Sequence, residues 1–259
     1  PLYMNWMQAW ADCMREDGSM PHTAPNPYAA GGGPFWCGFI ITASWQTYLN
    51  YGDRRLLDRY YPYMQQWLEY VAHYTIDGLL KKWPDTSYRN WYLGDWATPV
   101  GIDQTNPLSV DLVDNCYIAV CYQTMSKIAS LLGKADDSRG YKAKYDALTK
   151  RIQETFYDAK GNTYASGTQI DLVYPMLAGV TPDNLKETVL KTLYEVTANR
   201  FQGHLATGLV GIPVLTEWAV KNGQAEWMYQ MLKKRDYPGY LYMSVSYTHL
   251  RAHETDSYL

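Results

Sequence analysis

Apolar residues recur at steps of three and four along most of the chain, and no convincing stretch alternates apolar with polar residues. The first pattern is typical of amphipathic helices, whereas alternation would indicate half-buried strands. The sequence therefore predicts an all-α protein. Turn signals such as Tyr51-Gly52-Asp53 and Asn222-Gly223 separate successive periodic segments. Nine helices are expected, at about residues 3–15, 38–51, 54–75, 109–132, 138–157, 168–178, 182–198, 208–221 and 224–234.

The connections between these helices alternate between long and short. Because short turns join antiparallel helices, every second connection lies on the same face of the assembly. The pattern predicts an incomplete (α/α)6 toroid whose pocket opens where the long loops meet. A solenoid of helical repeats is the structural alternative, but the hairpins differ in length and motif where an array would repeat both. The longer loops, expected on one face, are residues 16–37, 76–108, 158–167 and 199–207.

Composition adds a preference for one class of ligand. The chain has 259 residues, of which 47% are hydrophobic, so it can bury a large core. A net charge of -3 without long runs of one sign argues against nucleic acid and membrane surfaces as partners. The chain carries 25 Tyr and 10 Trp but only 4 Phe, and rings with a polar group suit wet, partly apolar clefts. Sugars bind in such clefts, because an indole covers the C–H face while polar groups bind the hydroxyls.

A disulfide framework and a metal site are not expected. The four cysteines form no C-x-x-C pair and have no histidine at metal-ligand spacing; two of them, Cys116 and Cys121, lie in one predicted helix. No apolar run reaches 18 residues, and the first residues lack the layout of a signal peptide. The compartment stays open between the cytoplasm and secretion.

The first long loop, REDGSMPHTAPNPYAAGGGPFW, contains four prolines and a run of three glycines. The prolines exclude a helix, and the glycines let the backbone approach a ligand closely. Trp36 at its end is interpreted as a stacking platform for a sugar ring, or alternatively as a plug that packs the loop onto the scaffold.

The second long loop interleaves tryptophans with charged residues in WPDTSYRNWYLGDWATP. Asp95, beside Trp96 and close to Trp91, can accept two sugar hydroxyls while the rings cover the apolar face. The alternative role for Asp95 is to cap the loop by accepting backbone N–H groups. His204, in a glycine-flanked loop, is a candidate donor to a sugar hydroxyl, although a His satisfied by a backbone carbonyl is the more common case.

No pair of acids stands out as the general acid and base of a glycosidase. The loop acids are Glu16, Asp17, Asp95, Asp103 and Asp171, and the first two are interpreted as a helix end and turn. Ser109 is expected to cap the long helix. Whether Asp114 and Asn115 face the toroid axis or its wall is open.

Six segments in order resemble bacterial α-L-rhamnosidases of glycoside hydrolase family 78, over residues 1 to about 243. The segments are MREDGSMPHTAP, GGGPFW, YGDRRLLDRYYPYMQQWLEYV, LGDWATP, SVDLVDNCYIAVCYQTMSKIASLLGK and GHLATGLVGIPVL. The resemblance implies an (α/α)6 toroid that cleaves terminal α-L-rhamnose with inversion and without a cofactor. It matches Trp36 to a family Trp after the glycine run, and Asp95-Trp96 to a Gly-Asp-Trp loop. Where many members have an Asp shortly after the first Trp, this chain has Cys37-Gly38-Phe39.

The resemblance also implies that the chain is a fragment. The family's general acid lies upstream of its first residue and the general base lies after Tyr240, so the chain itself is expected to be inactive and to lack flanking β-domains. The expected partner is a rhamnose-containing carbohydrate or glycoside. Residues 1–243 are predicted to form the partial toroid, and residues 244–259 a non-native or disordered tail. Two alternatives stay open: another toroidal glycosidase, fucosidase- or trehalase-like, or a non-catalytic helical-repeat protein.

Overall fold

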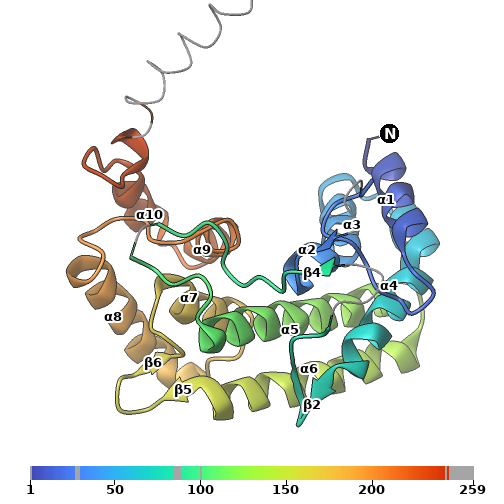
Figure 1. Ribbon diagram of the computed structural model, residues 1–259. Coiled ribbons are helices and arrows are strands. Elements are labelled where there is room, and N and C mark those ends of the chain that lie inside the picture. The colour runs from blue at the N-terminus through green and yellow to red at the C-terminus, as the bar shows by residue number, and fades with distance from the viewer. Residues whose placement is uncertain (1, 27–29, 85–88, 100, 243, 245–259) are drawn as a thin grey trace, which may run out of the picture. The chain divides into compact units, whose positions relative to one another are not determined.

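A computed structural model describes residues 2–26, 30–84, 89–99, 101–242 and 244 of the chain (Figure 1). Helices dominate, and the strands are two-residue pairs. The helices are α1 (Leu2–Cys13), α2 (Pro34–Cys37), α3 (Phe39–Tyr51), α4 (Arg55–His73), α5 (Pro107–Leu131), α6 (Ala135–Phe156), α7 (Gln169–Leu177), α8 (Asp183–Asn199), α9 (Gly211–Lys221) and α10 (Ala225–Leu232). The strands are β1 (Ala30–Gly31), β2 (Thr75–Ile76), β3 (Leu79–Leu80), β4 (Arg89–Asn90), β5 (Tyr157–Asp158) and β6 (Thr163–Tyr164).

All nine predicted helices are present, with ends that differ by at most three residues from the expected ones. The prediction that the first loop excludes a helix was wrong for α2. Pro34 is the first residue of that short helix, a position where proline's missing N–H costs no hydrogen bond. The strands were also missed. They pair as β1 with β4 in parallel, and as β2 with β3 and β5 with β6 in local hairpins; segments of two residues are too short to show a periodicity.

The N-cap of α5 is Asn106 and not the expected Ser109. The Asn106 side chain accepts hydrogen bonds from the backbone N–H groups of Leu108 and Ser109, at 3.1 and 3.4 Å. Pro107 follows at the first helical position. Asn before Pro starts a helix efficiently, because the amide oxygen satisfies exposed donors and the proline ring presets the backbone.

The chain divides into two compact units. The first holds residues 1–94, 105–157 and 178–180, and the second holds residues 95–104, 158–177 and 181–259. In the first unit α5 is the central helix: eight successive residues, 112–119, are buried, so that other parts of the unit surround it on every side. In contrast, α4 buries positions spaced by three and four, including Leu57, Met64 and Trp67, which is the pattern of a helix with one face toward the core.

Asn115 fastens β3 to α5 in the first unit. Its amide oxygen accepts the Leu80 N–H at 2.8 Å, and its amide nitrogen donates to the carbonyls of Leu80 and Asp111, at 3.1 and 2.8 Å. Asn115 is fully buried, as is Asp114 beside it. Both residues of the pair left open by the sequence therefore belong to the interior of this unit.

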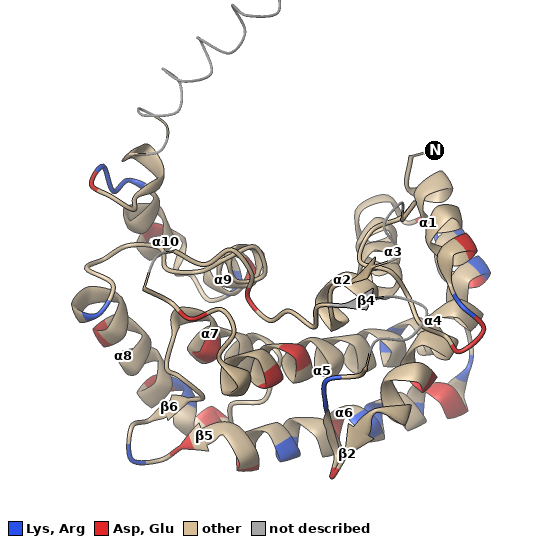
Figure 2. Ribbon diagram, viewed as in Figure 1, with Lys and Arg blue, Asp and Glu red and all other residues tan. Residues whose placement is uncertain are grey.

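In the second unit, α7 packs against both α8 and α9. Charged residues of both signs are interspersed along the surface helices, as Figure 2 shows for α6 and α8. Within the described residues, no helix is long and apolar enough to cross a membrane. The predicted tail, residues 244–259, lies outside the described residues except for Ser244, so its nature stays a prediction.

Candidate functional site

In the first unit, the two tryptophan-bearing loops are joined by backbone hydrogen bonds. β1 and β4 form a parallel pair, and the ladder continues where Trp91 N–H donates to the Gly31 carbonyl and Leu93 N–H to the Gly32 carbonyl, both at 2.9 Å. The Trp91 side chain is 48% exposed, and its ring lies 5.2 Å from that of His22. The pairing fixes the backbone from which Trp91 projects into solvent.

Glycines explain how Trp36 is placed in the same unit. A Cβ at Gly32 would lie 3.1 Å from Trp36 Cγ, so the indole rests over a position that has no side chain. Gly33 has a φ of +98°, a conformation that other residues rarely adopt, and a Cβ there would press on the Leu93 backbone. Trp36, the third residue of the four-residue helix α2, is half-buried. A platform role and a packing role for Trp36 are therefore both served by this geometry.

Asp95 belongs to the second unit, where it joins its loop to the start of α9. One carboxylate oxygen accepts the Gly208 N–H at 2.7 Å, and the other accepts the Val210 and Gly211 N–H groups at 3.1 and 2.8 Å. Only 6% of Asp95 is exposed. Burial raises the pKa of Asp95, while these three hydrogen bonds lower it and the charge of Asp171 raises it further. The geometry is that of a cap satisfying the free donors at a helix N-terminus.

This arrangement leaves Trp96 accessible. Its backbone carbonyl accepts the Leu209 N–H at 2.7 Å, whereas its side chain is 42% exposed. Asp95 thus holds the backbone from which Trp96 projects. The sugar-ligand hypothesis for Asp95 stays a prediction, and its observed hydrogen bonds favour the capping alternative.

The glycines of the segment after His204 make the Asp95 contact possible. A Cβ at Gly208 would overlap the Trp96 carbonyl oxygen, and one at Gly211 would lie 2.8 Å from an Asp95 carboxylate oxygen. Two backbone segments more than 100 positions apart therefore meet at van der Waals distance only because no side chain intervenes.

We expect Gly208→Ala to lower the melting temperature, because the methyl group would displace the loop that carries Trp96 and weaken the Asp95 cap. Forcing an extra carbon into such a packed contact costs about 1–3 kcal/mol. The matched control is Gly140→Ala in α6, where an added Cβ meets nothing within 4 Å. That variant should be more stable than the parent by about 0.5–1 kcal/mol, because alanine is the better helix former. Thermal unfolding followed by circular dichroism measures both; equal shifts in the two variants would contradict the packing argument.

His204 is almost fully buried in the second unit, with both ring nitrogens near oxygen atoms. Nδ1 lies 3.1 Å from the Phe201 carbonyl, and Nε2 lies 3.3 Å from a carboxylate oxygen of Asp236. Hydrogen bonding to its own backbone, opposed by burial and helped by the charge of His204, lowers the pKa of Asp236. His204 has the carbonyl contact expected of a structural loop histidine, and its role as a sugar donor stays a prediction.

Gln169 fixes the strand-like segment that follows His204. Its amide nitrogen donates to Thr197 Oγ1 and to the His204 carbonyl, at 3.0 and 3.1 Å, and its amide oxygen accepts the Ala206 N–H at 2.7 Å. Gln169 is fully buried. No sequence pattern indicates this role, because a lone glutamine at a helix start carries no recognisable spacing.

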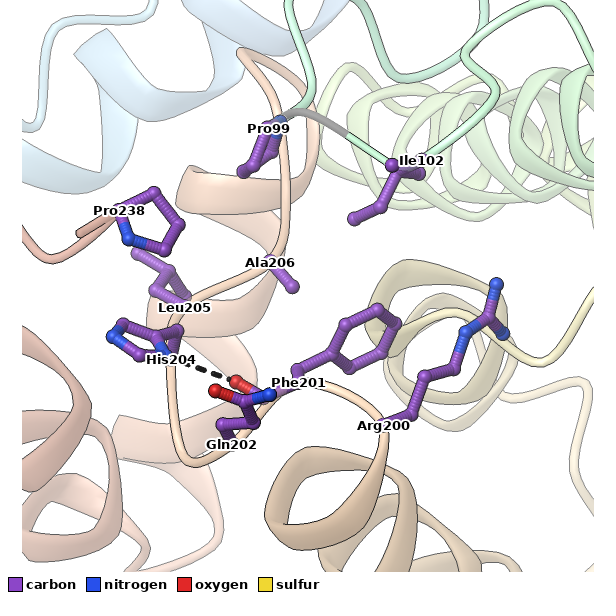
Figure 3. Close-up of a pocket in the computed structure, with 10 residues that line it drawn as sticks. Pro99, Ile102, Arg200, Phe201, Gln202, His204, Leu205, Ala206 and Pro238 are labelled. Carbon is purple, nitrogen blue, oxygen red and sulfur yellow. Dashed lines mark hydrogen bonds between the residues drawn. The ribbon is translucent and has the colours of Figure 1, made fainter.

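A cavity of about 260 Å³ lies beside this segment (Figure 3). Its walls come from the loop after Trp96, from the segment after α8 and from the turn near the end of the described chain. The described lining residues are Pro99, Gly101, Ile102, Arg200, Phe201, Gln202, His204, Leu205, Ala206 and Pro238. Of the predicted site residues, His204 lines the cavity, and Trp96 lies three positions before its first wall residue.

The predicted site residues are thus divided between the units. Trp36 and Trp91 belong to the first unit, and Asp95, Trp96 and His204 to the second. Their convergence on one face remains a prediction. The other candidate acids occupy positions with separate roles: Asp17 accepts the Ser19 N–H in the turn after α1, Asp103 is exposed, and the buried Asp171 accepts hydrogen bonds from Ser166 and Thr168.

Asp114 is the most unusual ionisable group of the described residues. Neither carboxyl oxygen has a hydrogen-bond partner, and no part of the residue is exposed. Burial, with a contribution from the nearby charge of Asp111, raises the pKa of Asp114 well above its usual range. Within the part of the chain that the structure describes, no group of three or more His, Cys, Asp or Glu side chains is placed to hold a metal ion.

Comparison with known proteins gives one consistent result. The family model described as bacterial alpha-L-rhamnosidase 6 hairpin glycosidase domain matches residues 1–247. An alpha-L-rhamnosidase of Formosa agariphila is 25% identical over 248 residues, covering 93% of this chain and 25% of that protein. One from an Alteromonas species is 24% identical over 245 residues, covering 88% and 24%.

Comparison with solved structures gives the same result. The alpha-L-rhamnosidase of Dictyoglumus thermophilum superposes with a TM-score of 0.84 at 27% identity, over 94% of this chain and 27% of that one. The enzyme of Streptomyces avermitilis, in complex with L-rhamnose, superposes with a TM-score of 0.80 at 24% identity, over 94% and 22%. The chain therefore spans about a quarter of the length of these relatives.

Proposed function

Because this chain belongs to the bacterial α-L-rhamnosidase six-hairpin glycosidase family, we propose that it is part of an enzyme that releases terminal α-L-rhamnose from glycosides or polysaccharides. Family membership confirms the all-α, six-hairpin fold class and decides against the helical-repeat alternative. Since the relatives are about four times longer than the chain, the proposal concerns the longer protein.

The observation that carries the proposal, beside the family match, is that two exposed indoles stand in the long loops on firmly held backbone. Trp91 and Trp96 are 48% and 42% exposed, and each projects from a backbone held by hydrogen bonds to a neighbouring loop. A rigidly held, accessible indole is suited to stack on the C–H face of a sugar. Trp36, Trp91, Trp96 and His204 are proposed to form the substrate-binding wall, and Asp95 is proposed to serve it by holding the backbone that carries Trp96.

The catalytic carboxyl groups are proposed to lie outside this chain. Inversion needs a protonated and an ionised carboxyl group about 6.5–9.5 Å apart, so that a water molecule fits behind the anomeric carbon. The buried loop acids Asp95 and Asp171 have their oxygens committed to backbone or hydroxyl donors. Asp114 is enclosed in the interior. The residues of this chain would therefore bind and orient the sugar, while groups elsewhere in the protein transfer the protons.

The test uses the longer protein, in which this chain is joined to the remaining length found in its relatives. It should hydrolyse an aryl α-L-rhamnoside, and Trp96→Ala should raise KM with a smaller effect on kcat, because stacking acts on the ground state and the transition state alike. A loss on the order of 1 kcal/mol corresponds to roughly a fivefold rise.

Tyr229→Ala on α10 is the control, since that exposed ring is remote in sequence from the loops, and it should leave KM unchanged. The 259-residue chain alone should give no turnover above background, because general acid–base catalysis contributes about 10²–10⁴-fold. No hydrolysis by the longer protein would contradict the proposed function, and turnover by the 259-residue chain would contradict the placement of the catalytic groups.

A further inference from the structure

Among the described residues, the cavity beside Trp96 is lined by charge of one sign, which is positive. Arg200 is the only Lys, Arg, Asp or Glu among the described residues that line it. The other walls are apolar or amide-bearing, apart from His204, whose ring nitrogens face the Phe201 carbonyl and Asp236. A ligand group entering this cavity therefore meets a guanidinium with no lining carboxylate to neutralise it.

The Arg200 guanidinium is held in place by only part of its hydrogen-bonding capacity. Nη1 donates to the carbonyls of Ser166 and Gly167, at 3.1 and 3.4 Å. Arg200 forms none of the ion pairs found among the described residues. Its Nε and Nη2 donors, which form the other edge of the planar group, bind no protein acceptor in the described part of the chain. That edge matches the two oxygens of a carboxylate.

An aromatic ring lies under the same guanidinium. The centre of the Arg200 guanidinium is 5.0 Å from the centroid of the Phe201 ring. Figure 3 shows the Phe201 ring and Ile102 facing each other across the cavity, with the Arg200 side chain next to Phe201. The ring orients the guanidinium by a cation–π contact and offers an apolar surface to a ligand. The cavity volume of about 260 Å³ is below the range of about 300–1,000 Å³ typical of drug-sized ligands, so it suits one sugar-sized group.

We propose that this cavity binds a uronic acid, a pyranose bearing a carboxylate, with Arg200 as the residue that selects the charge. Arg200 binds the carboxylate through its Nε and Nη2 edge, and Phe201 and Ile102 contact the C–H faces of the ring. The inference deepens the proposed function and rests on it in one respect: the uronic acid is taken to be the sugar that neighbours the rhamnose to be released.

The chain itself links the cavity to the proposed rhamnose-binding wall. The loop from Trp96 turns back through the hydrogen bond between Thr98 Oγ1 and the Ile102 carbonyl, at 3.0 Å, and supplies Pro99 and Ile102 to the cavity. If a disaccharide stacks its rhamnose on Trp96, its second sugar is therefore close to a cavity lined by residues of the same loop. A neutral neighbouring sugar would leave the Arg200 edge unpaired.

The test compares two ligands that differ only in the carboxylate, methyl β-D-glucuronide and methyl β-D-glucoside, by calorimetric titration at low ionic strength. We expect the longer protein to bind the glucuronide at least tenfold more tightly. Arg200→Gln should abolish that preference, because the amide keeps hydrogen-bonding groups but loses the charge and the fork. Arg139→Gln, on the exposed face of α6, removes the same charge outside the cavity and should keep the preference.

Equal affinity for the two glycosides, no binding of either, or an unchanged preference in Arg200→Gln would overturn the inference. The readout is separate from that of the proposed function. If the longer protein hydrolyses an aryl rhamnoside but does not bind the glucuronide, the proposed function is supported and the uronate site is refuted. If it binds the glucuronide through Arg200 but hydrolyses no rhamnoside, the uronate site is supported. The proposed function, and the assignment of the uronate as the neighbour of rhamnose, are then refuted.

Discussion

Asp95→Asn should lower the melting temperature of the protein by about 4–8 °C. The substitution keeps one oxygen to accept the Val210 and Gly211 N–H groups, but it turns an NH2 group toward the Gly208 N–H. A buried donor is then left without an acceptor, and the hydrogen bonds that remain lose their charge. Such a change costs about 2 kcal/mol, and one kcal/mol corresponds to roughly 2–4 °C for a protein of this size.

The control for this variant is Glu217→Gln, which makes the same chemical change on the exposed side of α9. Glu217 pairs with Lys221 one turn later, and such surface pairs contribute about 0.3–0.5 kcal/mol. Its melting temperature should change by no more than about 2 °C.

Kinetics of Asp95→Asn in the longer protein decide between the two roles of Asp95. A capping role predicts normal kcat/KM for each folded molecule, because the carboxylate touches only backbone N–H groups. A sugar ligand predicts an unchanged melting curve with a tenfold to hundredfold loss of kcat/KM, the equivalent of about 1.5–3 kcal/mol. We expect the first outcome, and the second would show that the oxygens of Asp95 serve the substrate.

The helices could be predicted from the sequence because their signal is local. The spacing of apolar residues and the Gly-containing turns set each helix end within three residues, and membership of the family was carried by six motifs in order. The start of α5 was misplaced, because Ser109 and Asn106 are both good caps and only the Pro that follows Asn106 distinguishes them.

The site was harder to predict because its contacts are not local. Asp95 and Gly208 are 113 positions apart, and Gln169 and His204 are 35 apart. The sequence named Asp95 and Trp96 as a pair and offered both a sugar-binding and a capping role, but the cap's partners lie in another loop. Gly208 and Gly211 permit a close approach of two segments, and only the structure shows that the Asp95 loop is the second one.

Asp114 is a fully buried acid, and the sequence left open whether it faces the toroid axis or its wall. The ionisable groups near it are Asp111 one turn earlier on α5, Tyr92 in the loop after β4 and Cys37 at the end of α2. Burial raises the pKa of Tyr92, with a smaller contribution from Asp114, and burial raises the pKa of Cys37 to about 12. Both neighbours therefore stay neutral at neutral pH, and Asp111 repels a second negative charge. No cation among the described residues pairs with Asp114.

Asp114→Asn should therefore stabilise the protein at neutral pH. In the unfolded chain the carboxyl group ionises above a pKa of about 3.9, whereas in the folded protein its raised pKa keeps it protonated to higher pH. Because the unfolded state binds fewer protons in that window, the free energy of unfolding falls as pH rises, by up to about 1.4 kcal/mol per pH unit. Asparagine cannot ionise, so it avoids this loss while keeping nearly the same shape.

Melting curves of parent and variant from pH 4 to pH 8 test this expectation. The two should unfold at similar temperatures near pH 4, and the advantage of Asp114→Asn should grow as pH rises toward the folded-state pKa of Asp114. Asp146→Asn, an exposed α6 residue paired with Lys142, is the control and should show no such growth with pH. A variant that is less stable than the parent at pH 7, or a difference independent of pH, would mean that Asp114 is ionised and stabilised in the folded protein. Tyr92 in the loop after β4 and Cys37 in α2 would then lie near a buried negative charge to which the described residues donate no hydrogen bond.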